Sequence, residues 1–324
     1  MTNFAETLRM LTRNPDADVF ASNGTSAVRG LLPAPVDFPT LWSRPSTAGE
    51  FLIEPLIPKG RQTALYALAK GGKSLLMLEC AAALATGRAV LDQPPREPAT
   101  VVYLDMEMTE DDLRDRLEDL GYGPDDNLDR LVCFLLPALP PLDTKAGGDV
   151  LLAICDAYRP DCVLIDTMGR TIQGPENDAD TFRAYFRHTG SRLKAANITT
   201  VRLDHAGKDE TRGQRGSSGK TEDVDLVWHL TAQGPNVKLR ATHKRLPWVP
   251  DEVLLTRVVE PFLSHKPAPR AWPPGTAETA AALDRLNVEL DATARDALSA
   301  LRTTNEGRRR EVVCAALRYR RNRS

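Results

Sequence analysis

Residues Ala67 to Ser74 read ALAKGGKS, and their types and spacing are suited to binding the phosphates of a nucleotide. Gly72 permits a tight turn, Lys73 supplies an ammonium group, and Ser74 supplies a hydroxyl that can ligate Mg²⁺. A strand-like run precedes the motif and a helical run follows it, so loop N–H groups and a helix N-terminus can surround a phosphate. The residues predict a P-loop for ATP and Mg²⁺, although Ala67 replaces the first glycine of GxxxxGK[ST]. The alternative is a Gly-rich helix start that binds no nucleotide.

Asp166 is the candidate for the carboxylate on the other side of the metal. It ends the apolar run CVLID, as expected of an aspartate that holds the magnesium shell beside a P-loop. The alternative role for Asp166 is a turn or helix cap. Ser74 and Asp166 are the predicted metal-binding residues. The residues predicted to contact ATP are Ala67, Leu68, Ala69, Lys70, Gly71, Gly72, Lys73, Ser74, Leu75 and Asp166.

Glu107 is the candidate base that would orient or activate a water molecule for hydrolysis. It lies just after the apolar run VVYLD, within the segment LDMEMTEDDLRDRL. An alternative role is at a helix start, because Thr109 and Asp112 form a plausible capping box there, and the two roles are compatible. Asp105, nearer the strand end, is the rival base.

His205 follows the apolar run ITTVRLD and precedes a long polar, Gly-rich segment, residues 207–220. A histidine at a strand end is commonly a hydrogen-bonded structural residue. The cations of the following segment, Arg215 among them, indicate either polyanion binding or contact with the nucleotide of a neighbouring subunit. A solvated loop is the alternative for this segment.

Composition and length restrict the class of protein. A chain of 324 residues with a net charge of -2 can bury a full α/β core, and it lacks the uniformly basic surface of a nucleic-acid coat. The five cysteines show no paired CxxC spacing, which indicates buried thiols in a reducing compartment. Because no segment has about 20 consecutive apolar residues, we expect a cytoplasmic protein that does not use a membrane.

The distribution of prolines and apolar runs divides the chain into four parts. Residues 1–50 predict an extended Pro-rich arm with one short helix at its start, and residues 51–260 predict the main domain. Residues 261–275 contain five prolines and are predicted to be a linker. Residues 276–324 have helical spacing, interrupted at 305–307, and predict a small basic helical module.

The main domain alternates between strand-like and helical runs. Five short apolar runs separated by helical segments predict a mostly parallel sheet that is buried on both faces. Three later runs, DLVWHL, NVKLRATHK and EVLLTRVVE, are joined by short turn-rich links and predict an antiparallel extension of that sheet.

The order of these motifs resembles RecA-type hexameric helicases of the DnaB and plasmid RepA kind over roughly residues 51–259. The most specific parts are YLDMEM at 103–108 and the stretch from HAGK to RGSS that begins at His205. The resemblance implies an α/β RecA-like P-loop NTPase core, with the His205 strand between the P-loop strand and the Asp166 strand. It also implies that Glu107 is the catalytic base and that His205 senses the γ-phosphate.

The resemblance further implies that basic residues on the late strands act on the nucleotide of an adjacent subunit. Lys244 and Arg245 occupy that place here, and Arg215 is a second candidate. A cation supplied in trans can be worth about 10³ to 10⁵ in turnover. The two residues are adjacent in this chain, whereas the corresponding lysine and arginine of DnaB are one residue apart.

The end of the chain is basic. From Arg302 onward, eight arginines face only Glu306 and Glu311, which gives a net charge of +6. Counterion release from such a patch favours sequence-independent binding to phosphate backbones, and a solvated arginine-rich helix is the alternative.

These features predict an ATP-hydrolysing ring, expected to be a hexamer, that moves along single-stranded DNA as a replicative helicase. Its expected partners are further copies of itself, single-stranded DNA, and a replication initiator, loader or primase. The alternative is a DNA-binding ATP switch that unwinds nothing, such as a helicase loader, recombination mediator or regulator. A small-metabolite kinase is a third reading.

Overall fold

A computed structural model describes residues 35–43, 49–176, 178–206, 223–268 and 272–323. The chain forms two compact units, residues 1–46 and 47–324. In the first unit, helix α3 (Phe38–Ser43) leaves the side chains of Phe38, Leu41 and Trp42 exposed. The short helix expected at the start of the arm lies outside the described residues.

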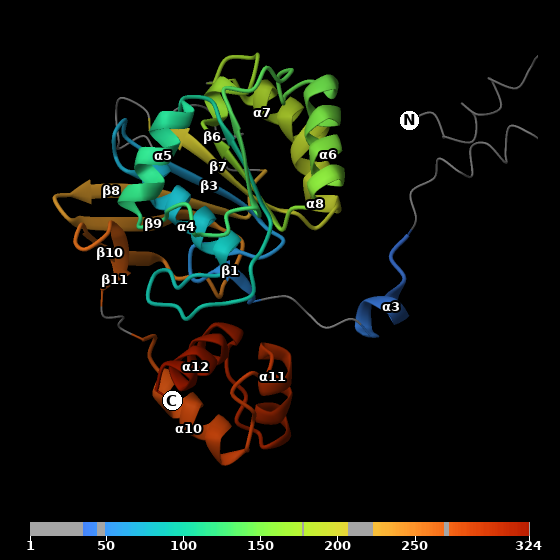
Figure 1. Cartoon of the computed structure of the whole chain (residues 1–324). Helices are drawn as coiled ribbons and strands as arrows, with labels where there is room; N and C mark the ends of the chain where they lie inside the picture. The colour runs from blue at the N-terminus through green and yellow to red at the C-terminus, as the bar shows by residue number, and fades with distance from the viewer. Residues whose placement is uncertain (1–34, 44–48, 177, 207–222, 269–271, 324) are drawn as a thin grey trace, which may run out of the picture. The chain divides into compact units, whose positions relative to one another are not determined.

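The second unit is built on a nine-stranded sheet with the order β11-β10-β9-β8-β3-β7-β6-β4-β5 (Figure 1). Within the run β8-β3-β7-β6-β4-β5, adjacent strands are parallel. Strands β9, β10 and β11 continue the sheet beyond β8 in antiparallel pairing. The P-loop strand is β3, and β7, which ends at His205, lies between it and β6, as expected. The strand bounds are β3 Gln62–Ala67, β4 Val101–Asp105, β5 Leu131–Leu135, β6 Cys162–Asp166, β7 Thr199–His205, β8 Leu226–Gln233, β9 Asn236–Lys244, β10 Glu252–Val258 and β11 Ser264–Pro267. A separate two-stranded sheet joins β1 (Phe51–Ile53) to β2 (Ile57–Pro58).

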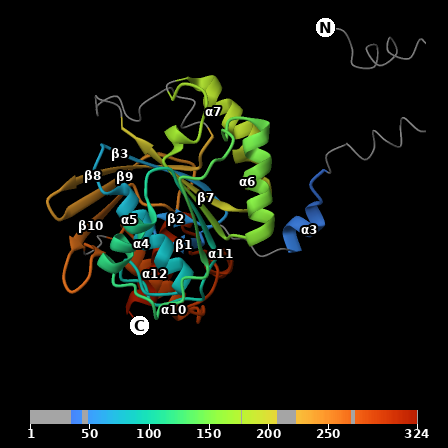
Figure 2. The ribbon, with the colours of Figure 1, turned by 45° about the horizontal axis from the view of Figure 1, so that its top comes forward.

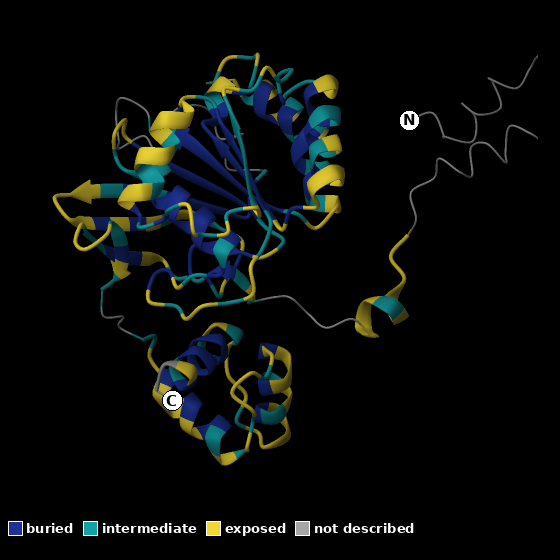
Figure 3. Cartoon of the chain, viewed as in Figure 1, coloured by how far each residue is buried: buried dark blue, intermediate teal, exposed yellow. Residues whose placement is uncertain are grey.

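Two layers of helices cover the sheet. Helices α4 (Lys73–Thr86) and α5 (Glu110–Asp119) lie along one face, and α6 (Lys145–Tyr158), α7 (Ala179–Tyr185) and α8 (Ser191–Ala195) lie along the other (Figures 1 and 2). Alternate residues of β4 enter the two cores: Tyr103 packs on the α4 side and Leu104 on the α6 side. The central strands are therefore buried on both faces (Figure 3), as their continuous apolar runs predict.

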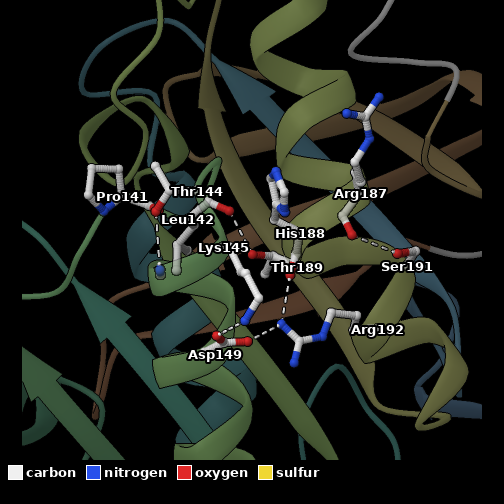
Figure 4. Close-up of polar contacts among 11 residues, drawn as sticks. Pro141, Leu142, Thr144, Lys145, Asp149, Arg187, His188, Thr189, Ser191 and Arg192 are labelled. Carbon is white, nitrogen blue, oxygen red and sulfur yellow. Dashed lines mark hydrogen bonds and ion pairs between the residues drawn. The ribbon is translucent and has the colours of Figure 1, made fainter.

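Helix α6 approaches a π-helix (Phe186–Gly190) that connects α7 to α8 (Figure 4). A side chain could not be added at Gly148, because its Cβ would lie 2.0 Å from the carbonyl oxygen of His188. That oxygen accepts a hydrogen bond from Arg192 at 3.2 Å, and the Thr189 hydroxyl donates to the carbonyl of Leu142 at 2.6 Å. These close contacts hold the second helix layer together.

The segment predicted as a linker, residues 261–275, contains the edge strand β11. Its His265 is buried against α4, where its main-chain N–H donates to Glu79 at 3.0 Å and its ring Nδ1 lies 2.6 Å from the same carboxylate. Prolines are tolerated at the ends of an edge strand. The proline content that predicted a linker is therefore also compatible with this strand. The first of the three late strands also differs from expectation, because β8 pairs in parallel with β3 and the antiparallel extension begins at β9.

The C-terminal module consists of three helices, α10 (Thr276–Arg285), α11 (Ala294–Thr303) and α12 (Arg310–Arg323), around a small apolar core. Its basic surface is smaller than the sequence suggests. Arg318 is buried, its Nε lies 2.8 Å from Glu54, and it donates to the carbonyl of Trp248. Arg320 is also buried and forms an ion pair with Asp284. At least two of the eight arginines thus hold α12 in place and are not available to a polyanion.

The described residues contain no helix that combines the length and apolar character needed to cross a membrane. All five cysteines are free, and all except the partly exposed Cys133 are buried. Burial raises the pKa of Cys133 and Cys162 to about 12 in each case, so both thiols stay protonated at neutral pH.

We expect Arg318→Ala to reduce the free energy of unfolding by about 2–3 kcal/mol, because it removes the buried guanidinium that pairs with the partly buried Glu54 and bonds the carbonyl of Trp248. Glu54 retains 29% exposure of its side chain, which keeps the loss below that of a fully buried pair. Arg309→Ala removes an exposed arginine of the same module and should change stability by less than about 0.5 kcal/mol. Urea unfolding measures both; equal effects would mean that Arg318 does not anchor the module.

Candidate functional site

The parallel strands bring the predicted residues to one edge of the sheet. Ala67 at the end of β3 is in register with His205 of β7, and Asp166 at the end of β6 is in register with Asp105 of β4. Because parallel strands have their carboxyl ends at the same edge, residues up to 138 positions apart in sequence meet there. The P-loop, both carboxylates and the histidine therefore belong to one site.

The P-loop connects β3 directly to α4. Gly72 has a φ of 90° and caps the helix, a conformation that favours glycine, and Lys73 begins the helix with its side chain buried. The Cβ atom of a side chain at Gly71 would lie 3.0 Å from that of Ala67, so the methyl group of Ala67 leaves no room beside it. Ala67 is thus accommodated by a glycine at position 71. The resulting turn closes with a hydrogen bond from the Gly71 N–H to the Leu68 carbonyl at 3.0 Å.

Asp166 lies directly opposite the start of α4. It is 3% exposed, accepts a hydrogen bond from Tyr103 at 3.0 Å, and is hydrogen-bonded by the Ser74 hydroxyl. Burial raises its pKa, the Ser74 bond and Lys73 oppose this, and the charge of Asp105 adds to it. A hydroxyl and a carboxylate in contact are the hard oxygen donors that Mg²⁺ prefers, so these residues fit the ion.

Asp105 has a structural role in the loop that carries the candidate base. Its Oδ1 accepts hydrogen bonds from the main-chain N–H groups of Glu107 and Met108, at 2.7 and 2.6 Å. Burial raises the pKa of Asp105, and these two bonds lower it without cancelling the effect. A buried carboxylate that accepts two main-chain bonds is poorly placed to meet water, which favours Glu107 over Asp105 as the base.

The side chain of Glu107 is 46% exposed at this edge and forms an ion pair with Arg170, Nε to Oε1, at 2.9 Å. The helix start after it is formed by the expected capping box, in which Thr109 and Asp112 each bond the main-chain N–H of the other. Glu107 therefore lies just outside α5, in the turn between Asp105 and the cap.

His205 is the last residue of β7 and is partly buried. Burial lowers its pKa, and the charge of Lys73 lowers it further, while Glu176 and Glu107 act in the opposite direction. The next residue, Ala206, donates its N–H to the carbonyl of Ala67 at 2.8 Å. The end of β7 is thus hydrogen-bonded to the beginning of the P-loop.

A sequence model of the AAA domain matches residues 33–211, which is more than half of the chain. The chain belongs to the AAA domain family. Its core is therefore a P-loop NTPase fold of the RecA type, as expected, and membership implies nucleotide binding, typically with Mg²⁺. The matched range includes the P-loop, Glu107, Asp166 and His205. No curated protein matches the chain.

The candidate trans-acting residues lie outside the matched part of this AAA domain protein. Lys244 is in register with Leu226 of β8, which pairs with Thr63 at the start of β3. Lys244 and Arg245 thus lie toward the edge of the sheet opposite their own P-loop. Lys244 forms an ion pair with the exposed Asp251. The third candidate, Arg215, lies outside the described residues, as does the whole of the segment 207–220.

Two residues of the candidate site, Tyr103 and Arg170, were not identified from the sequence. Tyr103, which bonds Asp166, stands two residues before Asp105 and so faces the same side of β4; a tyrosine in an aliphatic strand was the available signal. Arg170, which contacts Glu107, follows Asp166 by four residues in a short turn, and nothing in its spacing marks it.

We expect Asp105→Asn to weaken the pH dependence of stability. Both Asp105 and Asp166 have a pKa raised above the ordinary value of 3.8. The folded protein therefore binds more protons than the unfolded chain, and this contribution to stability is lost as pH rises from 3.8 through the folded pKa values. The asparagine oxygen can still accept the loop N–H bonds, while one titrating group disappears and the charge beside Asp166 is removed.

Urea unfolding at several pH values between about 4 and 7 measures the slope. Asp111→Asn, which neutralises an exposed carboxylate on α5, is the matched control. An Asp105→Asn slope equal to that of the parent protein would show that Asp105 does not contribute to the pH dependence of stability.

Proposed function

We propose that the protein is an ATP-hydrolysing, ring-forming motor that acts on single-stranded DNA as a replicative helicase. One observation carries the proposal: Lys73, the Ser74 and Asp166 pair, Glu107 and His205 converge on one edge of the sheet. These are the groups that phosphate binding, metal binding, water activation and phosphate sensing require.

Each residue has a separate role in the proposed reaction. Lys73 neutralises charge on the β and γ oxygens, and Ser74 and Asp166 hold Mg²⁺, which would supply electrostatic stabilisation of the transferring phosphoryl group. Glu107 orients the attacking water. His205 is hydrogen-bonded through its neighbour Ala206 to the P-loop, so a change at the phosphate can be passed to the segment that follows.

The position of Lys244 and Arg245 supports activity in an assembly. Both lie toward the edge of the sheet opposite the P-loop of their own chain, which separates them from the nucleotide that chain would bind. In a head-to-tail ring they would face the nucleotide of a neighbour, with ATP between subunits. Hydrolysis would then depend on oligomerisation, for which a hexamer is our proposal.

The proposed DNA contact rests on fewer cations than the sequence suggested. Arg318 and Arg320 are committed to internal contacts, whereas Arg302, Arg308 and Arg309 are exposed. We assign the main DNA contact to the basic segment 207–220, with the exposed arginines of the module as auxiliaries. A replication initiator, loader or primase is the proposed class of protein partner.

The decisive experiment is ATP binding by calorimetry, with and without Mg²⁺. We expect magnesium-dependent binding that Lys73→Ala weakens by about 100-fold or more, because an ammonium contact to phosphate is lost. Glu107→Gln should bind ATP normally and lose about 10²-fold or more in turnover. ATP binding by Lys73→Ala that equals that of the parent would remove the P-loop from the mechanism, and normal turnover of Glu107→Gln would remove the base.

We expect the mass of the assembly to increase with ATP and Mg²⁺, and single-stranded DNA to stimulate hydrolysis. Light scattering and a strand-displacement assay with a forked duplex measure these properties. ATP-dependent DNA binding without strand displacement would identify the switch, such as a loader, mediator or regulator. A monomer under all conditions would contradict the ring.

A further inference from the structure

The proposed catalytic glutamate is held by an arginine to which no role has been assigned. Arg170 Nε donates to Glu107 Oε1 at 2.9 Å, and both side chains are roughly half exposed, 61% and 46%. Among the described residues, the other oxygen, Oε2, takes part in no hydrogen bond or ion pair. We propose that Arg170 is a positioning residue that holds Oε1 so that Oε2 faces the attacking water; this inference rests on the role proposed for Glu107.

The main chain fixes the two ends of this pair relative to each other. Strands β4 and β6 are parallel neighbours, and the Met106 N–H donates to the carbonyl of Asp166 at 2.7 Å, which locks the turns after both strands together. The turn that carries Arg170 is itself closed by its N–H bond to the carbonyl of Thr167 at 3.1 Å. The backbone of Glu107 is held by Asp105. Only the side-chain torsions of the pair remain to be fixed, and the ion pair fixes them.

Electrostatics gives a reason why the glutamate needs a holder. Lys73 and Glu107 both act on the pKa of His205, so the three groups share one electrostatic neighbourhood. A freely rotating carboxylate there is attracted to the ammonium of Lys73, which must remain available for phosphate. Arg170, on the turn after β6, offers a competing cation that is 61% exposed. It thereby keeps the base and the phosphate-binding lysine apart.

The expected effect is kinetic. A half-exposed ion pair contributes little to folding, so its loss leaves the fold intact. A displacement of the base by about 1 Å can lower the rate on the order of 100-fold. Arg170 should therefore affect turnover far more than stability or nucleotide affinity.

The test is a double-mutant cycle with the full chain, measuring kcat and the dissociation constant of ATP. We expect Arg170→Ala to lower kcat about 10- to 100-fold and to change the affinity less than about threefold, because Arg170 contacts the base and not the nucleotide. Arg170→Lys retains one charged donor and should recover most of the loss. In the Glu107→Gln background, Arg170→Ala should change kcat by less than about twofold, because the group it positions is already inactive.

Arg183→Ala is the matched control, since Arg183 is 60% exposed and forms an ion pair with Asp180 on α7. Its kcat should equal that of the parent. Three results overturn the proposal: an unchanged kcat in Arg170→Ala, an equal loss in the Glu107→Gln background, or a loss confined to ATP affinity, which would make Arg170 a phosphate ligand. Failure of the proposed function can be distinguished from failure of the role proposed for Arg170. If the proposed function is wrong, the parent protein shows no ATP turnover, or Glu107→Gln alone shows the turnover of the parent.

Discussion

The parallel register of β4 and β6 is the constraint on which the site depends. It places Asp105 and Asp166 side by side, both almost completely buried, at the edge where the P-loop begins. Burying two carboxylates costs folding free energy unless their oxygens accept hydrogen bonds. Asp105 accepts hydrogen bonds from main-chain N–H groups, and Asp166 accepts them from Tyr103 and Ser74. One carboxylate therefore organises a loop, while the other is the residue that we propose as a ligand of the metal ion.

The same edge couples the strand that ends at His205 to the P-loop. A main-chain bond links the end of β7 to Ala67, and the imidazole of His205 responds to the charge of Lys73. Main-chain contacts of this kind are rigid, since they depend on strand pairing and not on side-chain rotamers. In the motor that we propose, a rearrangement at the phosphate would therefore reach the segment after His205 through a short and stiff connection.

The arginines of this chain have different structural roles, and the residues adjacent to them in sequence do not predict these roles. Arg318 and Arg320 lie in the most basic segment, yet they are buried and fasten the C-terminal module through ion pairs with Glu54 and Asp284. Arg170, by contrast, is isolated in sequence and contacts the proposed base. The net charge of a segment predicts whether it binds a polyanion only when its cations are exposed to solvent. The tertiary structure determines which of these cations are exposed.

The sequence by itself determined the sheet and the place of the P-loop, because these rest on local patterns: continuous apolar runs give buried parallel strands, and GKS after a strand gives a P-loop. The membership of the AAA domain family agrees with that reading. Only the tertiary structure decided what depends on distant partners. It placed β11 within a predicted linker through the contact of His265 with Glu79, and it assigned two arginines of α12, Arg318 and Arg320, to internal ion pairs. Such contacts join residues from 36 to 264 positions apart, and no local spacing encodes them.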